Sequence, residues 1–259
     1  MLLTTDLPEK QRHRRTPGGL QRSEVRPSSS WYGWCKRSAE LVVALLLAVL
    51  TAPLVLLASL GIKLTSRGPV LYSQTRVGRN GRPFAIYKLR TMVHDCERLT
   101  GPQWATSRDP RVTRFGRFLR RTHLDELPQL WNVLRGDMSL IGPRPERPEF
   151  VGHLEKALPH YRDRLLVRPG VTGLAQVQLP PDTDLDSVRR KLAYDLYYVR
   201  HGGPWMDLRI LFGTAFKMAG VPFWVIRAVF RIPGQDIVEQ TYRAATVAAA
   251  PVPAQAQSA

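Results

Sequence analysis

The 259-residue sequence predicts an α/β fold: a small domain with a β-hairpin and several helices, attached to a membrane by an N-terminal re-entrant helix and interfacial amphipathic helices. Three observations predict this arrangement. Residues 41–62 form a run of 22 residues without a charge, long enough as a helix to cross hydrocarbon. Asn80-Gly81, a turn dipeptide, stands between two strand-like segments, and residues 204–232 mix aromatic with basic side chains.

Charge and cysteine content limit the classes of function. The formal net charge is +17, and a basic excess of this size favours polyanionic partners such as nucleic acid, anionic lipid headgroups or phosphorylated small molecules. Composition does not choose among these three. The two cysteines, Cys35 and Cys96, have no metal-ligand or redox spacing, so they indicate neither a zinc site nor a disulfide framework.

The ends of the chain lack the periodicity of folded elements. Residues 1–35 are rich in Arg, Pro, Gly and Ser and predict a disordered basic tail, while residues 236–259 predict a low-complexity C-terminal tail. Between them we expect a re-entrant membrane helix at 36–63 and one folded domain at 64–235.

The membrane segment carries a proline near its middle. Pro53 lacks a backbone donor and clashes with the preceding turn, so we expect the helix to break at Ala52 and Pro53. Basic residues flank both ends, and the positive-inside rule then places both flanks on the cytoplasmic side. We therefore favour a helix that dips into one leaflet and returns, with a kinked single span as the alternative.

The domain begins with a predicted hairpin. Residues 69–77 and 84–92 read as antiparallel strands around Asn80-Gly81. Leucines at three- and four-residue spacing then predict a helix over 124–134 that stops at Gly136.

Further helices are expected in the second half of the domain. Residues 187–200 read as a helix that either Asp184 or Asp186 could cap. The aromatic and basic residues of 204–232 suit helices in a membrane interface, and ordinary packing on the domain explains them equally well.

Lys88 and Arg90 form the first candidate site. They are separated by two positions along a predicted strand, so they would project to one face and could grip a diphosphate. Solvated strand cations are the simpler alternative.

The adjacent acids Asp125 and Glu126 form the second candidate site. They open the helix predicted over 124–134, where favourable interaction with the helix dipole could alone explain them. Arg120 and Arg121 stand just ahead, however, and paired acids beside cations could hold a divalent ion against a phosphorylated substrate. A carboxylate can also attack phosphorus directly and form an acyl phosphate.

The third candidate site contains arginines set among proline and glycine. Arg144 lies between Pro143 and Pro145, whose rings restrict the backbone and would present the guanidinium rigidly to a phosphate. Arg168 precedes a Pro-Gly pair that permits a tight loop close to a ligand. A structural turn with an incidental cation is the alternative.

Together these blocks resemble the bacterial sugar transferase family, the monotopic polyprenyl-phosphate phosphoglycosyl transferases, in its compact form. The resemblance rests on four ordered motifs: Lys-Leu-Arg-Thr-Met at 88–92, Leu-Asp-Glu-Leu-Pro-Gln-Leu-Trp-Asn-Val-Leu at 124–134, Gly-Asp-Met-Ser-Leu-Ile-Gly-Pro-Arg-Pro at 136–145, and Arg-Pro-Gly-Val-Thr-Gly-Leu-Ala-Gln at 168–176. Their common order over some ninety residues is highly specific.

The resemblance implies a two-step exchange. Asp125 would attack the sugar-linked phosphate of a UDP-sugar and release UMP, and polyprenyl (undecaprenyl) phosphate would then take the phosphosugar from the enzyme. Glu126 and Asp125 would hold a magnesium ion (Mg2+), with Glu126 as metal ligand or proton handler. Arg120 and Arg144 would engage substrate phosphates, and the family's re-entrant helix would correspond to 41–62.

The same resemblance implies a setting. The protein would lie in the bacterial inner (cytoplasmic) membrane with its sugar transferase domain facing the cytoplasm and membrane lipid as a partner. It would initiate exopolysaccharide, O-antigen, capsule or other glycoconjugate synthesis, and homo-oligomer formation is left open. The segment after Gln176 departs from the Gly-Arg-Asn pattern of many members, so contacts to the donor sugar cannot be transferred.

Two other interpretations compete with this one. A non-catalytic basic protein tethered to the membrane could bind nucleic acid or anionic lipid, but the sequence lacks a nucleic-acid motif, so we expect no nucleic-acid partner. An inactive family member could survive as a scaffold, but the retention of Asp125, Glu126, Arg120 and Arg144 argues against it.

Overall fold

The computed structural model describes residues 30–96 and 109–248. Positions 1–29 of the basic tail predicted over 1–35, and positions 249–259 of the C-terminal tail predicted over 236–259, lie outside this part of the chain. Positions 30–35 of the predicted basic tail are helical, because the first helix already begins at Ser30. In chain order the elements are α1 (Ser30–Thr65), β1 (Leu71–Val77), the 3-10 turn η1 (Arg79–Gly81), β2 (Pro83–Leu89), α2 (Arg114–Thr122), the 3-10 turn η2 (Leu124–Glu126), α3 (Gln129–Arg135), β3 (Ser139–Ile141), α4 (Pro148–Ala157), the 3-10 helix η3 (Tyr161–Leu166), β4 (Gly170–Thr172), α5 (Leu174–Gln178), α6 (Leu185–His201), α7 (Pro204–Met218), α8 (Phe223–Phe230) and α9 (Gln235–Ala248).

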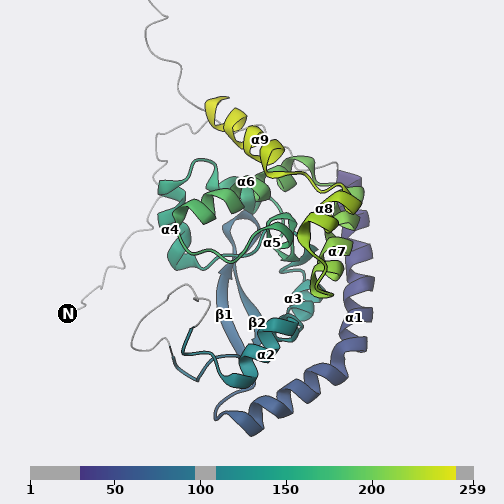
Figure 1. Ribbon diagram of the computed structural model, residues 1–259, viewed down its shortest axis with the longest axis vertical. Helices are drawn as coiled ribbons and strands as arrows, with labels where there is room; N and C mark the ends of the chain where they lie inside the picture. Colours follow the sequence, from purple (N-terminus) through teal and green to yellow (C-terminus); the bar gives the residue numbers. More distant parts are fainter. Residues whose placement is uncertain (1–29, 97–108, 249–259) are drawn as a thin grey trace, which may run out of the picture.

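Helix α1 runs along one side of the molecule and bends part-way, so that its second half passes beneath α2 (Figure 1). The helix is continuous through Pro53, so the break predicted at Ala52 and Pro53 does not interrupt it. The hydroxyl of Thr51 donates to the carbonyl of Leu47 at 2.7 Å, a contact that often accompanies helix bending. Re-entry into one leaflet stays a prediction.

Most of α1 exposes apolar side chains. It is the one helix among the described residues that is long and apolar enough to cross a membrane, with a mean hydropathy of 2.9. Leu50 and Leu64, on either side of Pro53, are 74% and 78% exposed. Soluble proteins rarely leave so continuous an apolar surface in water, which supports membrane association.

The β-hairpin is confirmed. β1 and β2 pair antiparallel, from Leu71 opposite Leu89 to Val77 opposite Pro83. The turn residues Asn80 and Gly81 have φ values of 57° and 78°, a conformation that these two residue types tolerate best. A second pairing was not predicted: the short strands β3 and β4 lie parallel, with Ser139 opposite Gly170.

The helix predicted over 187–200 is confirmed as α6. Asp184 is its cap, and the carboxylate accepts a hydrogen bond from the backbone N–H of Ser187 at 2.7 Å. The predicted C-terminal tail at 236–259 is partly wrong, because α9 continues to Ala248 and packs on α6. Val238 and Tyr242, four positions apart on α9, are both buried against it.

The domain has two apolar cores. The larger one gathers buried residues of β3 and α3–α9 with a few from α1 and the hairpin, and it includes Val133, Met138 and Leu192. The smaller one joins the second half of α1 to the hairpin and α2 through Ala58, Ile62, Leu89 and Leu119. These two cores meet at η2 and the residues around it.

Asn132 ties α3 to the hairpin. Its buried amide accepts a hydrogen bond from the N–H of Tyr87 at 3.1 Å and donates to the carbonyl of Ala85 at 2.7 Å. We expect Asn132→Ala to leave both backbone groups unpaired and to cost about 2–4 kcal/mol of unfolding free energy. Thermal unfolding of the detergent-solubilised protein measures this, with exposed Gln240→Ala on α9 as the control. Equal melting temperatures for the two variants would contradict it.

Candidate active site

The acidic pair lies in a turn between two helices. α2 ends at Thr122, its C-cap His123 has a left-handed backbone with a φ of 56°, and Asp125 and Glu126 follow in the single turn η2. The helix predicted over 124–134 is therefore divided. Pro128 precedes α3, which begins only at Gln129 and ends at Gly136 as predicted.

The turn is held between the two cores. Leu124 packs against the smaller core and Leu127 against the larger one, so the two acids sit where the cores meet. Neither acid lies in the first turn of α3, so the dipole of that helix does not by itself account for the pair.

Glu126 is the anchor of the site. Lys88 Nζ of β2 lies 2.7 Å from its Oε1, and Arg144 Nη2 lies 2.6 Å from the same oxygen. Arg144 Nη1 lies 3.4 Å from Oε2, so the guanidinium faces the carboxylate with both terminal nitrogens. Burial favours the neutral acid, but the charges and hydrogen bonds of Arg144 and Lys88 outweigh it and hold the pKa of Glu126 well below its ordinary value.

Asp125 has the opposite environment. It is 7% exposed, and within the described part of the chain no side chain forms an ion pair or hydrogen bond with its carboxylate. Burial and the charge of Glu126 raise the pKa of Asp125, while Lys88, Arg120 and His123 partly offset the effect. The site therefore contains one acid fixed by cations and one buried acid without such a partner among the described residues.

Arg120 is oriented by the segment that follows β2. Its Nε donates to Oγ1 of Thr91 at 2.9 Å. α2 approaches the same residue closely, because a Cβ on Gly116 would lie 2.0 Å from the Thr91 carbonyl oxygen. This close packing sets Arg120 where its charge reaches Asp125.

Three of the five predicted phosphate-binding cations gather here, namely Lys88, Arg120 and Arg144. Arg90 does not join them. It lies one residue beyond β2, where strand alternation no longer applies, and its Nη2 donates to the carbonyl and hydroxyl of Ser66 at 2.9 Å.

Arg168 also points elsewhere. Its Nε donates to the carbonyl of Gly136 at 3.2 Å, beyond the C-terminus of α3. Burial and the neighbouring charges of Arg37 and Arg79 lower its pKa. Its predicted contact with substrate phosphate has no support from this position.

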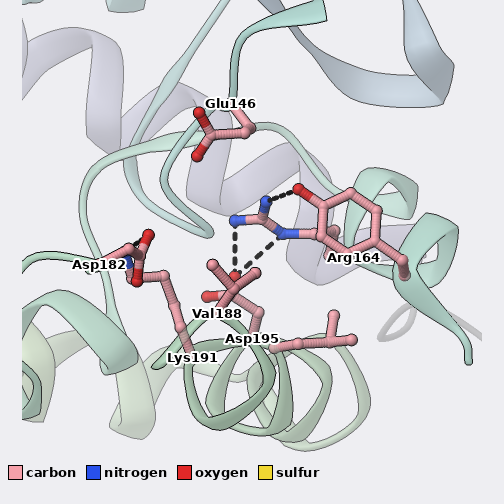
Figure 2. A pocket seen from close by; sticks show the side chains of 8 residues that line it. Glu146, Arg164, Asp182, Val188, Lys191 and Asp195 are labelled. Atoms are coloured by element: carbon pink, nitrogen blue, oxygen red, sulfur yellow. Dashed lines mark hydrogen bonds and ion pairs between the residues drawn. The ribbon is translucent and has the colours of Figure 1, made fainter. Parts of the chain in front are cut away.

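Sequence reasoning missed the side chains behind Arg144. Arg164 lies in a small buried cavity with Asp195 and Tyr161, and its guanidinium bonds to both of them (Figure 2). Nothing in the sequence around Arg164 distinguishes it from the many other arginines of this chain.

The aromatic segment over 204–232 forms α7 and α8, which pack against each other. Ile210 and Ile226 are buried, whereas Trp205 and Trp224 are 65% and 73% exposed. One face thus packs on the domain, and the other presents aromatic rings of the kind found at membrane interfaces.

Asp125 and Glu126 are two adjacent carboxylates that could hold a metal ion at this site. Residues 30–96 and 109–248 contain no group of three His, Cys, Asp or Glu side chains that could hold a metal ion. Two carboxylates can still suffice for Mg2+, which usually retains water and takes further oxygens from substrate phosphates.

The unpaired charge of Asp125 predicts a stability effect. Because its folded pKa is raised, the ionised carboxylate opposes folding at neutral pH, and this cost disappears once the group is protonated in both states. We expect Asp125→Asn to raise the melting temperature at pH 7 by about 2–4 °C, corresponding to roughly 1 kcal/mol. The gain should shrink towards about pH 4. Thermal scans at both pH values measure it, and a lower melting temperature for the variant at pH 7 would contradict it.

Comparisons with known proteins show what this chain is similar to. The family described as bacterial sugar transferase matches residues 31–220. A UDP-glucose:undecaprenyl-phosphate glucose-1-phosphate transferase of Caulobacter vibrioides is 49% identical over 183 residues, which cover 69% of this chain and 67% of the relative. The exopolysaccharide production protein PSS of Rhizobium leguminosarum is 45% identical, with 69% of this chain and 92% of the relative covered.

Longer relatives match only in part. A UDP-N-acetylgalactosamine-undecaprenyl-phosphate N-acetylgalactosaminephosphotransferase of Aeromonas hydrophila is 44% identical over 183 residues, and these cover 71% of this chain but 43% of the relative. The chain thus spans less than half the length of that protein. The family match extends from α1 to just beyond α7 and includes every residue of the acidic site, so this chain belongs to the bacterial sugar transferase family.

Proposed function

We propose that this protein transfers a phosphosugar from a UDP-sugar to polyprenyl (undecaprenyl) phosphate through an aspartyl-phosphosugar intermediate, releasing UMP. The observation that carries the proposal is the buried, unpaired carboxylate of Asp125 beside the ion-paired Glu126. Family membership supports the reaction class, and relatives named for undecaprenyl phosphate support the acceptor.

In the first half-reaction, an oxygen of Asp125 attacks the phosphorus that bears the sugar. The new bond joins this oxygen to phosphorus, and the bond from phosphorus to the bridging oxygen of the diphosphate breaks. UMP leaves with that electron pair, so no proton is needed from the enzyme. Lys88, Arg120 and Arg144 surround the acids with positive charge that offsets the negative charge of the diphosphate.

In the second half-reaction, a phosphate oxygen of the polyprenyl phosphate attacks the same phosphorus. The acyl phosphate bond breaks, the carboxylate of Asp125 is regenerated, and the product is a polyprenyl diphosphate sugar. Glu126 stays bound to its two cations and keeps Asp125 in place through both steps.

Magnesium is part of the proposal. Asp125 and Glu126 fit it, as two adjacent carboxylates near the position where the substrate's diphosphate would bind. Mg2+ would neutralise phosphate charge when bound. Because Glu126 already pairs with Lys88 and Arg144, it would share at most part of its oxygen capacity with the ion.

Membrane placement follows the acceptor. We propose that α1 is re-entrant and that the domain lies at the cytoplasmic face of the bacterial inner membrane, because both flanks of the helix are basic. The exposed rings of α7 and α8 would rest at the same interface. The acceptor's apolar chain could then stay in the bilayer while its phosphate reaches Asp125.

The donor sugar is not specified by these observations. Relatives are named for glucose and for N-acetylgalactosamine donors, and identities of 44–49% do not separate the two. The product would begin an exopolysaccharide, O-antigen, capsule or other glycoconjugate.

The proposal predicts magnesium-dependent release of UMP. Purified protein incubated with undecaprenyl phosphate and a panel of UDP-sugars should release UMP with at least one sugar, and intact mass should detect the phosphosugar adduct when the acceptor is omitted. Asp125→Asn should lose the adduct and at least about 10³-fold of the rate, because the nucleophile is gone. The matched control is Asp186→Asn at an exposed position of α6. An active, adduct-forming Asp125→Asn enzyme would remove Asp125 from this role.

The two acids also predict the acid limb of the rate profile. Since only ionised Asp125 can attack, kcat/KM should fall with unit slope as pH falls through its pKa, which burial raises above the ordinary value. Glu126 stays ionised over this range because its pKa is held well below its ordinary value. Steady-state rates between pH 8 and about pH 4, with circular dichroism as a folding control, measure the limb. A flat profile from folded protein would exclude Asp125 titration.

A further inference from the structure

The loop that carries Arg144 is held through its carbonyl groups. Two of its residues are prolines, which have no backbone N–H to donate. The backbone of this segment can therefore be held mainly by hydrogen bonds that its carbonyl groups accept. Four consecutive carbonyls each accept a hydrogen bond from a different donor: Pro143 from the Gly170 N–H at 2.9 Å, Arg144 from Arg164 Nη2 at 2.7 Å, Pro145 from Arg76 Nη1 at 3.2 Å and Glu146 from the Val77 N–H at 2.9 Å.

Arg164 makes the shortest of these contacts, and it acts on the residue that binds Glu126. Its side chain is almost completely buried, with 5% exposed. The guanidinium also donates from Nε to Asp195 Oδ2 at 3.0 Å and from Nη1 to the hydroxyl of Tyr161 at 2.9 Å. Figure 2 shows the guanidinium of Arg164 between α6 and the loop, with the carboxylate of Glu146 facing it.

The geometry suits positioning better than stability alone. Burying an ion pair such as Arg164–Asp195 costs desolvation that its attraction often fails to repay, and apolar replacements can be as stable. A planar guanidinium, by contrast, can fix three acceptors at set angles, which a lysine ammonium cannot reproduce. One of these three acceptors is the backbone of Arg144.

We propose that Arg164, held by Asp195 of α6, is a positioning residue for Arg144. By gripping the Arg144 carbonyl, it sets the distance and angle at which the Arg144 guanidinium meets Glu126 and, on the proposed function, the substrate phosphates. α6 is thereby connected to the active site although it contributes no side chain to the acidic pair.

The test compares Arg164→Lys with Arg189→Lys. Both arginines form an ion pair with an acid, but Arg189 of α6 pairs with Glu239 of α9 and does not contact the loop. Each variant is also combined with Arg144→Ala. Two quantities are measured: kcat/KM for UMP release, and amide hydrogen exchange by mass spectrometry in peptides covering 139–151.

We expect Arg164→Lys to lower kcat/KM about 10- to 100-fold, the size of loss that misplacement by about 1 Å can cause. In the Arg144→Ala background the same change should cost less than about threefold, since both act through one contact. Exchange in the loop peptides should accelerate in Arg164→Lys and stay unchanged in Arg189→Lys. Tyr161→Phe, which removes one contact of Arg164, should give the same pattern more weakly and replaces Arg164→Lys if that variant does not fold.

Three results would overturn the positioning role: unchanged kcat/KM, an equal loss with and without Arg144, or unchanged loop exchange. The exchange measurement needs no turnover, so it decides whether Arg164 holds the loop even if the wild-type protein releases no UMP. Absence of UMP from the wild type would instead overturn the proposed function.

Discussion

The carboxylate of Glu126 joins three parts of the chain that are far apart in sequence. Lys88 comes from the hairpin, Glu126 from the turn η2, and Arg144 from the loop after β3. Removing either cation would leave the buried carboxylate with a single cationic partner, and the loss of a partner from a buried ion pair costs more free energy than the intact pair contributes. Because Asp125 directly precedes Glu126 in the chain, these ion pairs also hold Asp125 in position without using its carboxylate oxygens. On the proposed function, anchoring falls to Glu126 and chemistry to its neighbour Asp125.

Sequence reasoning worked where local chemistry determines the structure. The Asn-Gly turn, the cap at Asp184 and the stop at Gly136 depend on a few adjacent residues, and the structure has all three. Lys88 and Arg144 could also be placed near the acids, because the family's ordered motifs carry three-dimensional information that spacing alone does not.

The predictions that failed depend on contacts between residues far apart in the sequence. Arg90 was expected on the same face as Lys88, but β2 ends before it. The guanidinium of Arg90 instead donates a hydrogen bond to Ser66, the residue that follows α1. Arg164 could not be found because its importance comes from a carbonyl twenty residues away in sequence. The helical residues of α9 were assigned to a tail, since two buried side chains in an alanine-rich segment give too weak a periodic signal.

The smaller core has a consequence for how this protein can be produced. Half of its four buried members, Ala58 and Ile62, come from α1, and the other two are Leu89 and Leu119. A soluble truncation that began after α1 would expose Leu89 and Leu119 to water and loosen the packing of Leu124, immediately before the acidic pair. The helix α1 is therefore part of the packing around the acidic pair as well as an apolar membrane segment. Lipid or detergent that covers its exposed face would help to keep this packing intact.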